Sequence, residues 1–309
     1  MSNEVIVIGH KNPDLDSVAS AIAFADFKNK TGEKGWIPKA AGKLDNETRF
    51  VFDKFKIKAP EIIENLKGKK VALMDHCTMC QIVNGIEDAE IVEVVDHHNI
   101  GDIETSKPIR FHNEPVGSTC TIIASYYFNH KIAVPEKIAQ LLLAGIISDT
   151  DLFKSPTTTQ LDLDIKKKLE KITGINSKML GAEMFKVKSN FSSKTTTQII
   201  TEDFKEYDLP LGVKLACSQA KTMNNKEFLS ERGDEILKVM KELSAKNNYD
   251  LFVVIITDLF KEGSDVFAIG RTDIFEKAMD AKLKNNHVYI PGLMSRKSQV
   301  IPKLIGLKE

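Results

Sequence analysis

Short apolar runs alternate with helical patterns over the first half of the chain. Three runs are almost continuously apolar, which is typical of strands buried on both faces of a parallel sheet: residues 4–9, 71–75 and 91–96. Apolar residues recur at helical spacing between and after these runs, from Val18 to Ala25 and over 119–130, 136–147 and 160–172. This alternation predicts an α/β domain with a doubly wound parallel sheet.

The pattern changes after a polar stretch, KVKSNFSSKTTTQ at 186–198, which is typical of a linker. Beyond it, one long amphipathic helix is expected at 225–246, among strand-like runs at 204–208, 213–219, 250–258, 264–270 and 287–291. We therefore expect an N-terminal domain at 1–188, a linker at 189–195 and a smaller α/β domain at 196–309.

Composition and charge narrow the class of protein. A chain of 309 residues is long enough for two cores, because single cores seldom exceed about 250 residues. Lys plus Arg and Asp plus Glu number 43 each, so no overall basic field favours nucleic acid. No apolar run approaches the roughly 20 residues of a membrane span, and the first residues lack the features of a secretory signal. With four scattered cysteines, the sequence predicts a cytoplasmic protein without membrane or nucleic-acid partners.

Acidic and histidine residues follow the ends of the apolar runs. The first run leads into GHKNPDLDS, the second ends in MDH, the third ends in VVDHH, and a later apolar run ends in ISDTD. In an open α/β sheet, ligands bind outside the carboxyl ends of the strands. We therefore expect six side chains to lie in one crevice at the carboxyl ends of the strands: His10, Asp14, Asp16, Asp75, His97 and Asp149.

The spacing in GHKNPDLDS suggests how its two aspartates lie. Pro13 biases Asn12 towards extended backbone, and residues two apart in an extended segment point the same way. Asp14 and Asp16 are therefore expected to point together, with Asp16 or Ser17 capping the helix that follows.

Four carboxylates in one crevice repel one another unless cations lie between them. Any one such Asp or His is most often a helix cap or a surface residue, so the prediction depends on the whole set. Two imidazoles among the carboxylates favour Mn²⁺, Co²⁺ or Zn²⁺ over calcium, and suit Mg²⁺ less well. Four carboxylates are more than one ion requires, which favours a site for two metal ions.

Basic residues near the other end of the chain could hold an anion. SRKSQ at 295–299 places Arg296 beside Lys297, and Lys205 lies in an otherwise acidic stretch. Each alone is most often a solvated surface residue. Beside two metal ions, however, an Arg fork and Lys point charges suit a small polyanion.

The motifs in this order resemble family II inorganic pyrophosphatases of the DHH phosphoesterase superfamily. The resemblance is carried by GHKNPDLDS, the strand-final Asp75, VVDHH, ISDTDLFKSPTTT and SRKSQ, and it covers essentially the whole chain. It implies a DHH metal-binding catalytic domain at 1–188 and a DHHA2-type substrate-binding domain at 196–309, with the active site between them. It also implies two Mn²⁺ or Co²⁺ ions per subunit, additional Mg²⁺ with the substrate, and a homodimer formed through the N-terminal domain.

The resemblance implies hydrolysis of pyrophosphate to two phosphates by a hydroxide that bridges two metal ions. Asp75 would be shared by both ions, and His98 would act as a general acid or polar anchor. The family's substrate-binding positions match His98, Lys205, Arg296 and Lys297. Its metal ligands match the six residues of the predicted crevice: His10, Asp14, Asp16, Asp75, His97 and Asp149.

Two stretches depart from the family pattern. DHCTMC stands where DHNE or DHSE is usual, and Ser298 stands where a second lysine is common. Cys77 and Cys80 form a CxxC without a second pair nearby, so two small residues that open a helix are favoured over a zinc or redox site.

Other functions remain open from the sequence. One is an exopolyphosphatase, and another is a phosphodiesterase for oligonucleotides or 3′-phosphoadenosine phosphate. The latter calls for base-stacking aromatics and a glycine-rich C-terminal motif in place of SRK. A third alternative, a non-catalytic metal-binding protein, is prompted by the altered DHCTMC stretch but opposed by candidate ligands at all six positions.

Overall fold

The computed structural model describes residues 4–189, 191 and 194–307. The chain divides into two compact units, Met1–Lys188 and Ser189–Glu309, which are described separately below. The predicted linker at 189–195 lies partly outside the described residues.

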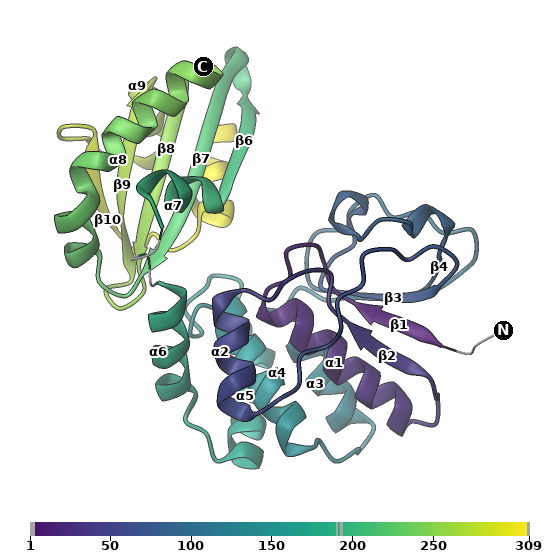
Figure 1. Ribbon diagram of the computed structural model, residues 1–309. Helices are drawn as coiled ribbons and strands as arrows, with labels where there is room; N and C mark the ends of the chain where they lie inside the picture. The colour runs from purple at the N-terminus through teal and green to yellow at the C-terminus, as the bar shows by residue number, and fades with distance from the viewer. Residues whose placement is uncertain (1–3, 190, 192–193, 308–309) are drawn as a thin grey trace. The chain divides into compact units, whose positions relative to one another are not determined.

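A five-stranded parallel sheet forms the centre of the N-terminal unit, which confirms the predicted α/β class (Figure 1). Its strand order is β2-β1-β3-β4-β5, so the chain leaves β1 towards one edge and returns to place β3 on the other side. The three predicted strands are present as β1, β3 and β4, whereas the short edge strands β2 and β5 were not predicted. The bounds are β1 Val5–Ile8, β2 Trp36–Lys39, β3 Lys70–Met74, β4 Glu90–Asp96 and β5 Arg110–Asn113.

Helices gather on one face of this sheet (Figure 1). Helix α1 packs on β1, β2 and β3, α3 packs near β4, and α4 packs against α1 and α3. Loops that include two short 3₁₀ turns cover the opposite face, where a doubly wound sheet would have helices, and Ile6, Leu73 and Val94 pack against them. The helix bounds are α1 Leu15–Lys30, α2 Asn46–Phe55, α3 Thr119–Asn129, α4 Glu136–Asp149, α5 Gln160–Thr173 and α6 Ser177–Lys188.

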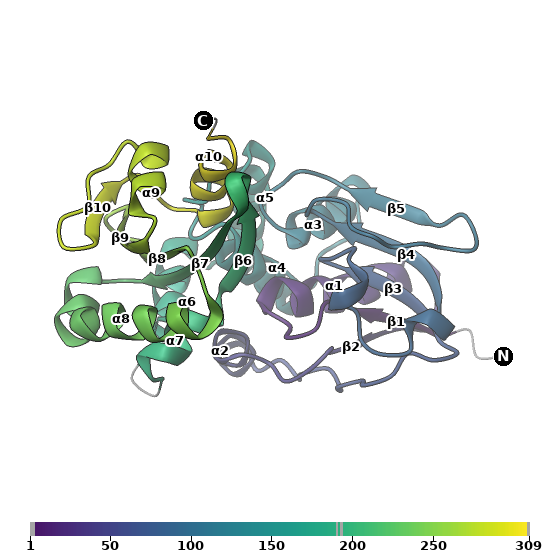
Figure 2. The ribbon, with the colours of Figure 1, turned by 90° about the horizontal axis from the view of Figure 1, so that it is seen from above.

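The C-terminal unit has a second five-stranded sheet, in the order β10-β9-β8-β7-β6 (Figure 2). Only the β7–β8 pair is parallel, and the central strand β8 is buried along its whole length. All five expected strands and the long helix are present. The strands are β6 Phe204–Leu209, β7 Val213–Thr222, β8 Leu251–Asp258, β9 Gly263–Gly270 and β10 His287–Pro291.

Each face of this second sheet has its own core. Side chains of α7 and α8 pack on one face, and side chains of α9 and α10 pack on the other. Because both faces are covered, β8 can be continuously apolar without exposing a hydrophobic surface. The helix bounds are α7 Thr196–Glu202, α8 Asn225–Asn247, α9 Thr272–Met279 and α10 Ile301–Ile305.

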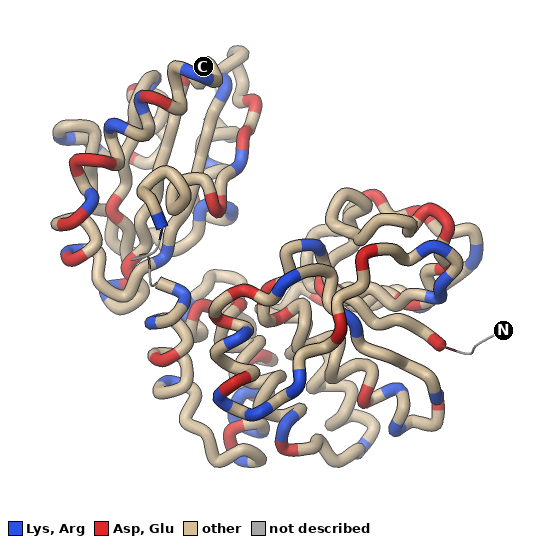
Figure 3. Tube along the Cα trace, viewed as in Figure 1, with Lys and Arg blue, Asp and Glu red and all other residues tan. Residues whose placement is uncertain are grey.

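Charged residues of both signs are interspersed along the traces of both units (Figure 3). This distribution agrees with the equal numbers of acidic and basic residues, 43 of each. Within the described residues, no helix combines the length and apolar character needed to cross a membrane.

Candidate metal centre

The connection between β1 and α1 carries three of the predicted ligands. Asp14 is the N-cap of α1, and its Oδ1 accepts a hydrogen bond from the Ser17 N–H at 3.0 Å. The prediction that Asp16 or Ser17 caps this helix is therefore wrong. Asn12 has a φ of 54°, so the predicted extended backbone before Pro13 is also wrong. Because helical backbone begins directly after Asp14, the two aspartates diverge and join different groups of side chains.

Gly9 lets α1 start close to the end of β1. A Cβ atom at Gly9 would lie 1.8 Å from Ser17 Oγ, and that hydroxyl also accepts a hydrogen bond from the His10 N–H at 3.1 Å. This close approach places His10 and the first turn of α1 in one fixed arrangement.

Replacing Gly9 with Ala is expected to weaken the binding of divalent metal ions by about 10- to 100-fold, because the methyl group displaces α1 and misplaces the candidate ligands on it. Titration calorimetry with Mn²⁺ measures the effect. Gly233→Ala is the matched control: a Cβ atom there, in the interior of α8, would lie 4.0 Å from the nearest side chain, and metal binding should be unchanged. Wild-type metal affinity for Gly9→Ala would show that this close approach does not position the site.

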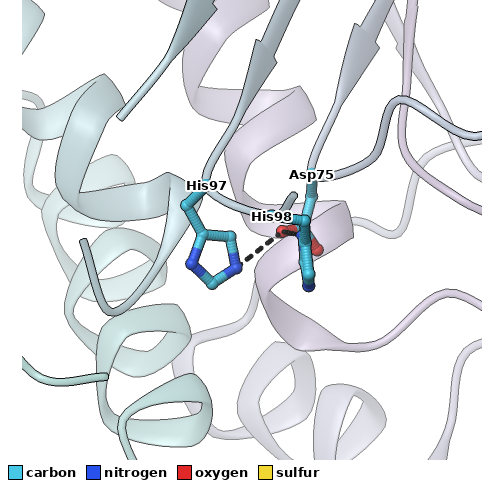
Figure 4. A group of neighbouring side chains, drawn as sticks. All are labelled: Asp75, His97 and His98. Atoms are coloured by element: carbon cyan, nitrogen blue, oxygen red, sulfur yellow. Dashed lines mark ion pairs between the residues drawn. The ribbon is translucent and has the colours of Figure 1, made fainter. Parts of the chain in front are cut away.

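Asp75 lies at the centre of the cluster, directly after β3 and next to the point where the strand order reverses. Its backbone has a φ of 67°, and its N–H donates to the Val95 carbonyl at 2.9 Å. Its Oδ1 lies 3.4 Å from His97 Nε2 (Figure 4). Its Oδ2 lies 3.6 Å from His10 Nε2. The two oxygens of this carboxylate therefore face different histidines.

All six predicted ligands come together around Asp75. Their nitrogen and oxygen atoms form small groups in which the atoms lie within 4.8 Å of one another, close enough to surround a metal ion. One group is formed by His10, Asp14 and Asp75, a second by Asp16, His97 and Asp149, and a third by Asp75, His97 and His98.

The two histidine rings are oriented as metal ligands would be. The Nδ1 atom of His10 lies 2.8 Å from the Lys11 carbonyl, and that of His97 lies 2.9 Å from the Val116 carbonyl. Since a carbonyl can only accept, Nδ1 carries a hydrogen in both rings, and Nε2 is left facing the carboxylates. His97 Nε2 is buried and lies 3.1 Å from Asp149 Oδ2 and 3.4 Å from Asp75 Oδ1.

The cluster is strongly negative. Burial alone would lower the pKa of His10, but hydrogen bonds and the charges of Asp14 and Asp75 outweigh it and raise that pKa to about 12. His97 shows the same balance, with a pKa of about 12 beside Asp149 and Asp75. Among the residues that the structure describes, these carboxylates form ion pairs only with histidines. The donor set therefore fits divalent cations that prefer mixed oxygen and nitrogen ligands.

His98 is held by a residue that the sequence showed only as part of a motif. Its Nδ1 lies 2.9 Å from Asp96 Oδ1, and the same oxygen accepts the backbone N–H groups of His97 and His98. Burial would raise the pKa of Asp96, but the hydrogen bond and charge of His98 hold it below its usual range. The His98 side chain is 42% exposed, so its other ring nitrogen is available to a ligand.

The two cysteines of DHCTMC have different surroundings. Cys77 is buried, and its Sγ accepts a hydrogen bond from the Gly101 N–H at 3.1 Å. Burial raises the pKa of this thiol to about 11, whereas Cys80 is exposed. Cys77 thus connects the segments that follow β3 and β4, which is a structural role.

The predicted cations of the C-terminal unit lie on β6, which carries Lys205, and in the helical turn Arg296–Val300. Arg296 is 6% exposed, and its guanidinium donates to the Asp203 carbonyl at 2.6 Å, the Cys217 carbonyl at 3.2 Å and Asp203 Oδ1 at 2.8 Å. Lys205 on β6 pairs in register with the same Cys217. Lys205 and Lys297 are both exposed. The structure therefore fixes the Arg296 side chain, whereas Lys205 and Lys297, the sequence neighbour of Arg296, reach solvent.

Comparison with family models identifies the class of protein to which this chain belongs. Residues 4–146 match the family described as "DHH family, N-terminal domain", and residues 182–306 match the DHHA2 domain. Together these matches cover well over half of the chain, in the order that the sequence resemblance implied.

The particular family follows from close relatives. The chain is 45% identical over 307 residues to the manganese-dependent inorganic pyrophosphatase of Methanothrix thermoacetophila, with 98% of both proteins covered. It is 41% identical over 307 residues to the enzyme of that name from Methanocaldococcus jannaschii, covering 96% of this chain and 97% of the relative. A crystal structure of a Methanococcus jannaschii protein assigned to family II inorganic pyrophosphatases is similar, with a TM-score of 0.77, 40% identity and coverage of 97% and 98%. This chain belongs to the family of manganese-dependent, or family II, inorganic pyrophosphatases.

Proposed function

We propose that this protein hydrolyses inorganic pyrophosphate to two phosphates at a centre that binds two Mn²⁺ ions per subunit. The observation that carries the proposal is Asp75, whose two carboxylate oxygens face two separate groups of ligands. His10, Asp14 and Asp75 would hold one ion. The other ion would be held by Asp16, Asp75, His97 and Asp149. The same donors suit Co²⁺, and we include Mg²⁺ as an ion that enters with the substrate.

When bound, the two ions would acidify a water molecule and neutralise charge on the phosphate oxygens. The chain itself supplies orientation and protons. Asp96 fixes the His98 ring by accepting its Nδ1–H, so Nε2 points away from Asp96 and can donate to an oxygen of the substrate when the ring carries a second proton. The buried floor of the cluster, where Asp16 and Asp75 are only 1% and 2% exposed, limits the access of bulk water.

Cations of the C-terminal domain would bind the substrate's remaining oxygens. Lys205, Arg296 and Lys297 have this role in the proposal, with residues 196–309 as the substrate-binding domain and 1–188 as the catalytic domain, joined at 189–195. Arg296 is already fixed by Asp203 and Cys217, so its ordering would cost little on binding.

The assembly and location of the protein are part of the same proposal. We propose a homodimer formed through the N-terminal domain, supported by the edge position of β5 and by its Phe111 side chain, which is 40% exposed. All four cysteines are free thiols, which supports a reducing cytoplasm. The even mixture of charges opposes nucleic-acid and anionic-membrane partners, which bind extended basic surfaces (Figure 3).

A phosphate-release assay tests the proposed function. Pyrophosphate, inorganic triphosphate and a dinucleotide are each supplied with Mn²⁺ or with Mg²⁺. We expect the fastest release from pyrophosphate with Mn²⁺, loss of activity after chelation, and recovery when Mn²⁺ is restored. Faster turnover of triphosphate would favour a polyphosphatase, and turnover of the dinucleotide alone would favour a phosphodiesterase. Mn²⁺ binding without any hydrolysis would favour the non-catalytic alternative.

A further inference from the structure

The N-terminus of α3 surrounds the carboxylate of Asp16. Asp16 Oδ1 accepts hydrogen bonds from Ser118 Oγ at 2.6 Å and from the Cys120 N–H at 3.0 Å. Its Oδ2 accepts a hydrogen bond from the Thr119 N–H at 2.7 Å. All four residues are buried, so these donors fix the carboxylate in one orientation.

Thr119 also reaches the shared carboxylate. Its hydroxyl donates to Asp75 Oδ1 at 3.0 Å. That oxygen is the one that faces His97, at 3.4 Å, whereas the other oxygen faces His10. Thr119 therefore contacts two carboxylates on the His97 side of the cluster, through its backbone to Asp16 and through its hydroxyl to Asp75.

The surrounding helices leave little room for these groups to move. A Cβ atom at Gly145 of α4 would lie 2.6 Å from Cys120 Sγ and 3.1 Å from Asp16 Oδ1. The start of α3, the start of α1 and the middle of α4 thus meet at this carboxylate. In such packing, loss of one hydroxyl is not compensated by a new partner from solvent.

We propose that Thr119 is a positioning residue that sets the Mn²⁺ affinity of the half of the centre formed by Asp16, His97 and Asp149. This inference rests on the proposed function, because it requires a centre with two metal ions. The Thr119 hydroxyl occupies one lone pair of Asp75 Oδ1, the oxygen that faces His97. Without it, Asp75 loses a buried donor on the His97 side while its contact with His10 is kept. Hydrogen-bond partners of metal ligands typically change metal affinity by about 10- to 100-fold.

Thr119→Val removes the hydroxyl and keeps the shape of the side chain, whereas Thr119→Ser keeps the hydroxyl. Thr121→Val is the matched control on the same helix, because it removes a buried hydroxyl that donates to Asp162 at 2.6 Å, away from the ligand groups. Mn²⁺ binding to the metal-free protein is measured by titration calorimetry, with thermal unfolding recorded for every variant. Thr119→Ala replaces the valine variant if the latter does not fold.

We expect Thr119→Val to weaken one of two Mn²⁺ sites by about 10- to 100-fold, with the other site and both sites of Thr119→Ser close to wild type. Thr121→Val should lose thermal stability and keep both affinities. Asp14→Asn should lower the Mn²⁺ affinity of the site beside His10. When Thr119→Val is added to Asp14→Asn, the Mn²⁺ affinity of the other site, beside His97, should fall as well. Unchanged binding by Thr119→Val, or equal weakening of both sites by both valine variants, would overturn the inference. A wild-type protein that binds no Mn²⁺ would instead overturn the proposed function.

Discussion

Replacing Asp75 with Asn abolishes both high-affinity Mn²⁺ uptake and pyrophosphate hydrolysis if this carboxylate is shared by two ions. The amide keeps one oxygen and presents N–H hydrogens on the other side. It therefore cannot bind one metal ion beside His10 and another beside His97. We expect kcat/KM to fall by at least about 10³-fold, more than the loss of a single preorganised donor usually causes. Asn tolerates the left-handed backbone at this position, where φ is 67°, so the fold should be kept.

The matched control is Asp280→Asn. Asp280 is exposed, ends α9 in the C-terminal unit, and has a φ of 49°, so the substitution repeats the chemical change in a similar backbone conformation. Its activity and Mn²⁺ binding should equal those of the wild type. Phosphate-release rates and titration calorimetry measure both quantities. An Asp75→Asn protein that is folded and still binds two Mn²⁺ ions tightly would contradict the sharing of this residue.

Replacing Arg296 with Ala is expected to raise KM for pyrophosphate by about 10- to 100-fold, the effect of losing a hydrogen bond to a charged group. Mn²⁺ affinity should stay unchanged, because the residue belongs to the C-terminal unit. The same substitution should lower thermal stability, since the Asp203 and Cys217 carbonyls lose their buried donor. Steady-state kinetics measured at temperatures below the unfolding transition separate the effect on KM from the effect on thermal stability.

Lys297→Ala is the companion variant for this test. Lys297 is exposed, so its loss should raise KM with little change in stability. Arg296→Lys keeps the charge but cannot make all three guanidinium contacts, and an intermediate KM is expected. Wild-type KM for both Arg296→Ala and Lys297→Ala would remove the C-terminal cations from substrate binding.

In the N-terminal sheet, apolar runs predicted the three inner strands but neither edge strand, whereas all five strands of the C-terminal sheet were expected. Strand β1 and all of β3 after Lys70 are buried and apolar, and β4 is buried over its last four residues, so their apolar runs are easily recognised. The edge strands interrupt any apolar run: β2 contains Pro38 and Lys39, and β5 contains three polar residues among its four, Arg110, His112 and Asn113. Helix α2 was also missed, although Asp45 caps it and an apolar side follows. For β2 and β5, the neighbouring strand defines the element more than local sequence does.

The site was predicted as a set, but its division into halves was not. Convergence at the carboxyl ends of parallel strands follows from topology, which the alternation of strands and helices reveals. The separation of Asp14 from Asp16 depends on the residue at which α1 begins, a local detail that residue spacing does not determine. The proposed role of Thr119 could not be predicted from the sequence, for another reason. It contacts Asp16, which lies 103 residues earlier in the chain, and its own sequence context predicts only a helix start.

Anomalous diffraction at the manganese absorption edge, from crystals grown with Mn²⁺, tests the two-ion arrangement most directly. The account predicts two peaks in each protomer, one beside His10 and Asp14 and one beside Asp16, His97 and Asp149, with a different oxygen of Asp75 bound to each. A single peak, or two peaks that Asp75 does not connect, would contradict it.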